Sequence, residues 1–129
     1  MKIFGQVELE HYRKGNLIAR QIFNNGITDE GANTLFDTAF RGVAAINPWY
    51  IGLIDAASFS ALASSDTMGS HAGWIPFTGY SQANRVAWAP DAASARTIVN
   101  TSTPVVYSIT ASGTIKGIFI SSDSTKGGT

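Results

Sequence analysis

The chain has 129 residues, of which 44% are hydrophobic and only 14% charged, so one ordered domain is expected rather than a disordered segment. Nine basic and nine acidic side chains give a net charge of zero, which argues against nucleic acid or an anionic membrane as the partner. No cysteine is present, which excludes disulfides and thiol nucleophiles and fits synthesis in the cytosol.

The N-terminal segment is expected to form a β-hairpin. Apolar and polar residues alternate over Lys2–Tyr12, which is the pattern of a half-buried strand. The charged residues Lys2 and Glu8 interrupt the apolar pattern, so this segment does not resemble a signal peptide. Turn residues follow at Arg13–Asn16, and Leu17–Phe23 then predicts the returning strand of a hairpin with one polar face.

One amphipathic helix is predicted over Asp29–Phe40. Thr28 is a suitable N-cap, and the acidic residues that open the helix suit the positive end of its dipole. Five apolar residues recur at the spacing of a single helical stripe, and we expect this stripe to lie across a sheet or to close one end of it. These residues are Ala32, Leu35, Phe36, Ala39 and Phe40.

A buried strand and a long loop are expected in the middle of the chain. Pro48–Asp55 is almost continuously apolar, as in a strand that is covered on both faces. Ala56–Gln82 is rich in small residues, and a short helical turn is expected within it over Phe59–Ala63. Because long ordered loops in compact domains are usually functional, this excursion is the expected contact region.

Short strands are expected again in the last third of the chain. Arg85–Ala89 and Arg96–Asn100 are two candidates. Val105–Thr110 and Ile115–Ile120 both alternate in polarity, and the small residues Ala111–Gly113 between them predict a hairpin.

The predicted elements together give a mostly β fold. We expect an antiparallel β-sandwich or a jelly-roll-like barrel with one amphipathic helix. A single β-rich domain is expected over residues 1–129, with a polar, flexible tail from about residue 121. No apolar run approaches the roughly 18 residues that a membrane-spanning helix needs.

No motif for catalysis, metal binding or cofactor binding is found. His71, with Asp66 and several serines nearby in sequence, is the strongest candidate for a catalytic base. The nearest match to a nucleophile elbow, Gly79–Ala83, lacks the final glycine and the strand–turn–helix context. Neither the spacing of a metal site nor a glycine-rich phosphate loop occurs. We therefore expect no enzymatic activity, no metal ion and no cofactor.

Five aromatic residues form the candidate partner interface. Such residues could equally be core, the centre of a protein interface, or a flat platform on which sugars stack. Tryptophan and tyrosine in a loop with few charges are typical of the centre of a protein interface. The candidate interface residues are Trp49, Trp74, Phe77, Tyr80 and Trp88.

Six short motifs are spread over most of the chain from residue 25 onward. They are Asn25–Gly31 (NGITDEG), Trp49–Asp55 (WYIGLID), His71–Trp74 (HAGW), Phe77–Ser81 (FTGYS), Arg85–Trp88 (RVAW) and Thr114–Phe119 (TIKGIF). As a set they resemble a family of small proteins encoded in tailed phages and prophages, although none of them encodes a chemical mechanism.

The resemblance implies a structural role in the virion, as a capsid decoration or cement protein that stabilises the shell through protein–protein contacts. The implied partners are the major capsid protein or other virion subunits, with a homo-oligomer expected and neither nucleic acid nor membrane. The implied location is the virion, assembled in the host cytoplasm. The alternative is a tail- or fibre-associated module that binds a carbohydrate or receptor through the aromatics around Trp74 and Tyr80.

The end of the chain departs from the family pattern. The family members run on past Lys126–Thr129 into further apolar strand sequence, whereas this sequence ends in polar residues. Two alternatives are open: a shortened chain, or a last sheet edge that a neighbouring subunit completes by adding a strand.

Overall fold

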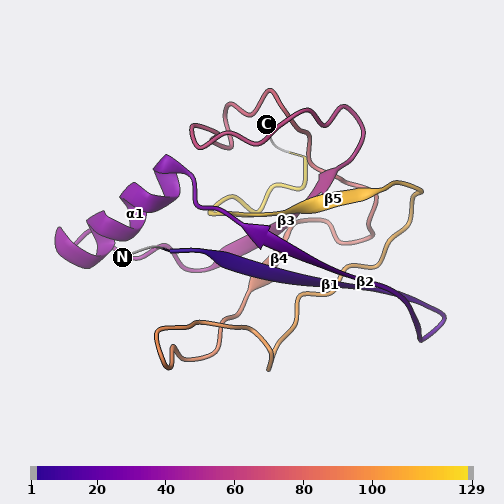
Figure 1. The fold of residues 1–129 in the computed structure, drawn as a ribbon, viewed down its shortest axis with the longest axis horizontal. Coiled ribbons are helices and arrows are strands. Elements are labelled where there is room, and N and C mark those ends of the chain that lie inside the picture. The colour runs from indigo at the N-terminus through magenta and orange to yellow at the C-terminus, as the bar shows by residue number, and fades with distance from the viewer. Residues whose placement is uncertain (1–2, 128–129) are drawn as a thin grey trace.

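A computed structural model describes residues 3–127, which form two antiparallel sheets and a helix (Figure 1). The chain is therefore mostly β, as expected from its sequence. The elements in chain order are β1 (Gly5–Arg13), β2 (Asn16–Asn25), α1 (Asp29–Phe40), β3 (Trp49–Asp55), β4 (Val86–Trp88) and β5 (Ile115–Ser121).

The N-terminal hairpin is confirmed with different bounds: among the described residues, which do not include Lys2, the first strand begins at Gly5, and the second strand runs on to Asn25. β1 and β2 pair antiparallel from Gly5 opposite Asn25 to the two-residue turn Lys14-Gly15. Both turn residues have positive φ, 50° and 80°, which is the backbone twist that suits a tight hairpin. The turn end of this hairpin reaches the edge of the molecule in Figure 1.

The second sheet has the strand order β4-β3-β5, with both neighbours antiparallel to β3. β3 is thus the central strand, which agrees with the apolar run in its sequence. The side that faces β4 is extended by a later segment, because Asp55 N donates to Ile75 O (2.9 Å) and Phe77 N donates to Leu53 O (2.8 Å). Both edges of β3 are therefore hydrogen-bonded along most of its length.

The helix has the predicted bounds and the predicted cap. Thr28 Oγ1 accepts a hydrogen bond from Gly31 N at 3.2 Å, as an N-cap residue does. Of the two expected placements of α1, the one across a sheet is wrong, because Figure 1 shows the helix to one side of both sheets. The placement that closes one end of a sheet stays a prediction. None of the residues Asp29–Phe40 is buried.

The core is built on both faces of β3, where residues 51–54 are all buried, and on the segment that follows this strand. Leu53, Phe77 and Tyr80 form its buried centre, and Tyr107 and Ile118 pack against them. The predicted excursion supplies two of these three central residues. It contains no helical turn at residues 59–63, contrary to expectation.

Within the excursion, every third residue from 71 to 80 is buried. This spacing is neither the period of two of a strand nor the 3.6 of an α-helix, and the segment turns twice, where Trp74 N donates to His71 O (3.3 Å) and Tyr80 N donates to Thr78 O (2.9 Å). This explains why the alternation test did not place the segment in the core. The buried residues are His71, Trp74, Phe77 and Tyr80.

Two of the predicted C-terminal strands are wrong. Neither Arg96–Asn100 nor Val105–Thr110 is part of a sheet strand. The second of these segments pairs with the excursion instead, because Thr110 N donates to Gly79 O (2.8 Å) and Ser81 N donates to Ser108 O (2.9 Å). The hairpin expected at residues 111–113 is therefore absent, and the described residues do not close into a barrel.

Residues 121–127 do not behave as the expected flexible tail. Ser121 ends β5 and is buried. Ser124 O accepts a hydrogen bond from Arg85 N at 2.8 Å, and Lys126 Nζ donates to Tyr80 O while lying 4.4 Å from the centre of that ring. These contacts hold the C-terminal segment against the core.

A glycine in β3 makes room for an aromatic ring on β5. Gly52 lies opposite Phe119, and a Cβ atom at position 52 would overlap the phenyl ring. Trp74 packs on the same ring, with 4.9 Å between the ring centres. The close approach of two strands and two aromatic rings therefore depends on the missing side chain at position 52.

Gly52→Ala is predicted to destabilise the fold by about 1–3 kcal/mol, the usual range for overpacking a tight interior. Gly26→Ala is the matched control, because nothing lies within 4 Å of a Cβ atom there and its φ is not positive. Urea unfolding at one fixed protein concentration measures both. Equal unfolding free energies for the two variants would contradict this account of the β3–β5 contact.

Candidate functional site

Three of the five predicted interface residues lie in the core. Trp74, Phe77 and Tyr80 are 6%, 4% and 2% exposed, so they are not available to a partner of the folded chain. Their burial corrects the interpretation of the aromatic set as one exposed patch. The sequence signal was ambiguous because a core residue and an interface residue are both large and apolar.

The other two predicted interface residues remain partly accessible. Trp49 and Trp88 stand directly opposite each other on β3 and β4 and are half-buried. Cross-strand aromatic pairs stabilise a sheet and can also present a flat surface. An interface role for these two residues stays a prediction.

The residues around His71 form a structural cluster. Asp66 accepts hydrogen bonds from Ala63 N and Trp74 Nε1, both at 2.9 Å, and these bonds hold the pKa of its carboxyl below the usual 3.8. The His71 ring stacks on Trp74 at 4.0 Å between centres, and its Nδ1 lies 2.9 Å from Trp74 O. Asp66 therefore orients Trp74 and not His71, which is unlike the acid–base pair of a catalytic triad.

A buried arginine joins the C-terminal segment to the core. Arg85 Nη1 donates to Asp123 O at 2.9 Å and lies 3.8 Å from Asp123 Oδ2, and the guanidinium stands 4.8 Å from the centre of the Phe119 ring. Burial lowers the pKa of Arg85. Beside it, Tyr107 Oη accepts from Val86 N (2.9 Å) and donates to Ile51 O. These groups are engaged in holding β4 and the C-terminal segment together.

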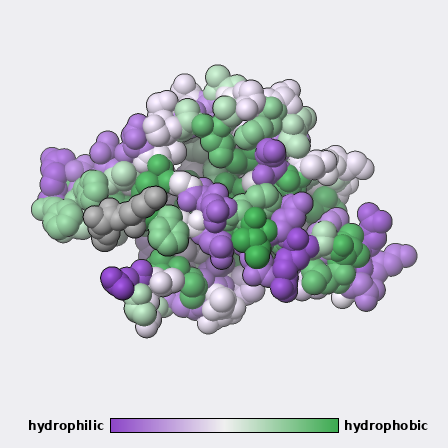
Figure 2. All heavy atoms as spheres, viewed as in Figure 1, coloured by the Kyte–Doolittle hydropathy of each residue, from purple (hydrophilic) through white to green (hydrophobic). Residues whose placement is uncertain are grey.

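Exposed apolar side chains gather on the hairpin and on the helix with its flanking residues. Eleven of the eighteen large exposed hydrophobic residues in the described chain fall within residues 3–43. We call this region the hairpin–helix surface, and Figure 2 shows apolar residues open to solvent along it. Its exposed residues are Ile3, Phe4, Tyr12, Leu17, Ile18, Ile22, Ile27, Leu35, Phe36, Phe40 and Val43.

The accessible area of the chain is large for its mass. A compact monomer of 13.7 kDa exposes about 6,600 Å², whereas this chain exposes 8,853 Å². The excess is about 2,250 Å², which is more than the roughly 800 Å² that each partner buries in a standard protein interface. The chain is thus less compact than an average monomer of its mass.

The charges on the hairpin are paired within the hairpin itself. Arg20 lies 2.9 Å from Glu8 and 2.5 Å from Glu10, and Tyr12 Oη donates to Glu10 at 2.7 Å. The bonds from Tyr12 and Arg20 lower the pKa of Glu10. Exposed Ile22 lies opposite Glu8 on the same face. A partner that covers this face therefore meets Ile22 beside two carboxylates that share one guanidinium, which leaves one net negative charge.

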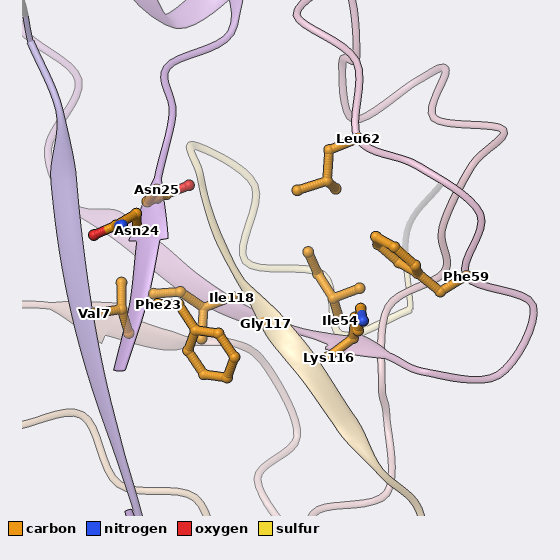
Figure 3. Close-up of a pocket in the computed structure, with 10 residues that line it drawn as sticks. All are labelled: Val7, Phe23, Asn24, Asn25, Ile54, Phe59, Leu62, Lys116, Gly117 and Ile118. Carbon is orange, nitrogen blue, oxygen red and sulfur yellow. The ribbon is translucent and has the colours of Figure 1, made fainter. Parts of the chain in front are cut away.

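The root of the hairpin is loosely packed on the rest of the molecule. A cavity of about 140 Å³ is lined by Val7 and Phe23 on the hairpin and by Ile54, Leu62 and Ile118 on the rest of the molecule (Figure 3). It is open to solvent and lined mainly by apolar atoms. The hairpin thus contributes little to the core of its own chain.

Comparison with protein-family models, with curated proteins and with solved structures finds no match. Within residues 3–127, no helix is both long enough and apolar enough to cross a membrane. The same residues contain no cluster of three or more histidine, aspartate or glutamate side chains that could hold a metal ion.

Asp66→Ala is predicted to flatten the acid dependence of stability. Because the folded-state pKa of Asp66 is lowered, its contribution is present above pH 3.8 and is lost as the pH falls below that value. The unfolding free energy of the natural chain should therefore fall more steeply below pH 3.8 than that of the variant.

Urea unfolding at a series of pH values measures this difference, with Asp37→Ala on the exposed side of the helix as control. Glu10, Asp91 and Asp123 also have lowered pKa values and account for the acid dependence that the variant retains. Parallel pH profiles for the natural chain and Asp66→Ala would show that Asp66 has no such role.

Proposed function

We propose that this chain is a structural subunit of a tailed-phage particle, a capsid decoration or cement protein that works by contact with other protein subunits. The observation that carries the proposal is the hairpin–helix surface. There, large apolar side chains are exposed on the hairpin and on the helix, and no residue of β1, β2 or α1 is fully buried. Large exposed apolar residues that gather in one part of a chain are typical of interaction sites.

The physical mechanism is stabilisation by binding. A protein that binds the assembled shell, but not the dissociated coat subunit, shifts the equilibrium toward the shell by mass action. Burial of the hairpin–helix surface supplies the favourable free energy, since removing apolar area from water is the main driving force of protein association. The proposal requires no reacting group.

The placement in a virion is supported by the resemblance of the six motifs to phage proteins. The partners proposed on this basis are the major capsid protein or other virion subunits. The expected sandwich then takes an intermolecular form, in which a neighbour covers the open face of the hairpin with its own sheet or helix. The free edge of β5 is a second place where a neighbouring strand can add.

A tail or fibre module that binds carbohydrate is the second candidate. Its original support came from Trp74 and Tyr80, which are buried. The half-buried pair Trp49 and Trp88 is the aromatic surface that still favours it. A glycan array with the isolated chain distinguishes the two candidate functions. A carbohydrate-binding module is expected to bind a glycan on the array, whereas a cement protein is not.

Particles that lack this protein are predicted to release their genome at a lower temperature than complete particles. The measurement is the release of DNA, followed with an intercalating dye during heating. Adding purified protein back should restore the higher release temperature. Identical release temperatures with and without the protein would contradict a cement role.

Ile22→Thr is predicted to lower the amount of protein on purified particles several-fold. The substitution removes exposed apolar area from the hairpin while keeping a residue that favours strands. Ile98→Thr is the matched control, because Ile98 is similarly exposed but lies outside the hairpin–helix surface. Equal occupancy of both variants, measured by quantitative gel electrophoresis, would remove the hairpin from the proposed contact.

A further inference from the structure

The outer edge of β5 has backbone groups to which no other backbone group within residues 3–127 is hydrogen-bonded. β5 ends its sheet and pairs only with β3. Leu53 O accepts from Phe77 N on the other side of β3, so Leu53 and Ile118, which stand opposite each other, do not bond to each other. The N–H and C=O groups of Ile118 therefore point away from β3, and so do those of Ile120, two residues further on.

A β-bulge marks where this regular edge begins. Gly117 stands opposite Ile54 and Ile115 stands opposite Asp55, so Lys116 is the extra residue between them. From residue 117 to residue 121 the register with β3 is continuous. The open edge is therefore a short, regular stretch of strand, suited to a partner segment of about five residues.

The cavity at the root of the hairpin lies along this edge, because residues 116–118 of β5 line it. In Figure 3, Val7 and Phe23 lie on one side of the β5 ribbon, and Phe59 and Leu62 lie on the other. The cavity thus extends to both sides of the strand. Successive side chains of a strand point to opposite faces, so a strand added to β5 would direct its side chains into both halves of this cavity.

The size and lining of the cavity favour small apolar side chains. A dry cavity of about 150 Å³ binds benzene, so the cavity of about 140 Å³ accepts two branched groups of about three carbons each. Its lining is mainly apolar. A segment with valine-sized residues at successive positions therefore fits, since one side chain would lie on each side of β5.

An acidic residue of the partner segment fits beside the cavity. Lys116 is exposed, and its Nζ stands 5.1 Å from the centre of the Phe59 ring. Among residues 3–127, no carboxylate forms an ion pair with Lys116. Asn24 and Asn25 line the cavity on the hairpin side. One ammonium and two neutral side-chain amides favour a carboxylate over a cationic group on the occupant.

We infer that the open edge of β5 accepts an extended segment of another polypeptide. This segment pairs with the backbone of Ile118 and Ile120, fills the cavity with small apolar side chains and places an acidic side chain at Lys116. Backbone hydrogen bonds supply the affinity of such a contact, and the cavity supplies its specificity. The inference deepens the proposed function, on which it rests for the source of the segment, a neighbouring virion subunit.

The first test measures amide hydrogen exchange in the isolated full chain by NMR. The amides of Phe119 and Ser121 point toward β3 and should exchange at least about tenfold more slowly than those of Ile118 and Ile120. Equal protection of these four amides would show that the edge is already covered, which overturns the inference.

The second test adds a blocked peptide, three valines followed by an aspartate with a threonine at each end, to the isotope-labelled chain. The amide signals of Ile118 and Ile120 should shift and saturate with a dissociation constant of roughly 1 mM or tighter. The same peptide with lysine in place of aspartate should bind at least about threefold more weakly, because it meets the ammonium of Lys116. Lys116→Glu should reverse this preference.

Gly117→Val fills the cavity while leaving the backbone edge in place. A Cβ atom at position 117 would meet only Ile54 Cδ1, at 3.9 Å, and the φ of Gly117 is not positive. The variant should resist urea at least as well as the natural chain, because valine favours strands, and should bind the aspartate peptide at least about tenfold more weakly. Ala87→Val, exposed on β4 and not part of the cavity lining, should bind the peptide normally.

The outcomes separate this inference from the proposed function. No saturable shift at Ile118 and Ile120, or normal binding by Gly117→Val, would overturn the strand site and leave the particle-heating experiment unaffected. A natural chain that dimerises, with a monomeric Gly117→Val variant, would identify a second copy as the occupant and also overturn the inference.

Hydrogen-exchange mass spectrometry on intact particles tests the source of the segment. Residues 115–121 should gain protection when the chain is bound to particles. Bound chain without this protection would overturn the inference. Peptide binding by the isolated chain, with no chain on particles, would contradict the proposed function and leave the strand site standing.

Discussion

The constraint on which this structure depends is the small amount of apolar surface that the chain can bury by itself. Its core surrounds the central strand of a three-stranded sheet and is closed by the segment His71–Tyr80 and by the C-terminal residues. Phe119 and Phe77 fill this space because Gly52, Gly79 and Gly113 leave room for their rings. The hairpin and the helix lie outside this arrangement, and their apolar side chains have no place in it.

The proposed function therefore assigns folding and assembly to different residues. Trp74, Tyr80 and Arg85 hold the body together through stacking and buried hydrogen bonds. The hairpin–helix surface makes few such contacts and contains most of the exposed apolar area. A division of this kind is expected for a subunit that reaches its final stability only when neighbours cover it, because exposed apolar surface has no stabilising role in an isolated chain.

The local elements could be predicted from the sequence, whereas their arrangement could not. Each of the correctly predicted elements has a signal among residues that are close in sequence. This signal is the apolar spacing for the helix over residues 29–40, the turn residues for the hairpin, and the continuous apolar run for β3. The segment from His71 to Tyr80 has a buried period of three, which no strand or helix test detects. The position of residues 105–110 depends on hydrogen bonds to Gly79 and Ser81, a non-local pairing that alternation alone misassigns to a hairpin.

The same limit explains the outcome for the candidate site. Trp49, Trp74, Phe77, Tyr80 and Trp88 share composition, yet only the fold separates the buried three from the half-buried pair. The apolar stripe of α1 could be predicted from the amphipathic pattern of the sequence. This pattern does not show whether the surface that packs on the stripe belongs to the same chain or to another. The absence of buried residues in residues 29–40 supplies that information.

The most direct test of the central claim is an electron cryo-microscopy map of intact particles in which this chain is traced. The account predicts that residues 3–43 lie against other protein chains and that the body around Trp74 faces away from them. A map in which the hairpin and α1 project into solvent would contradict it.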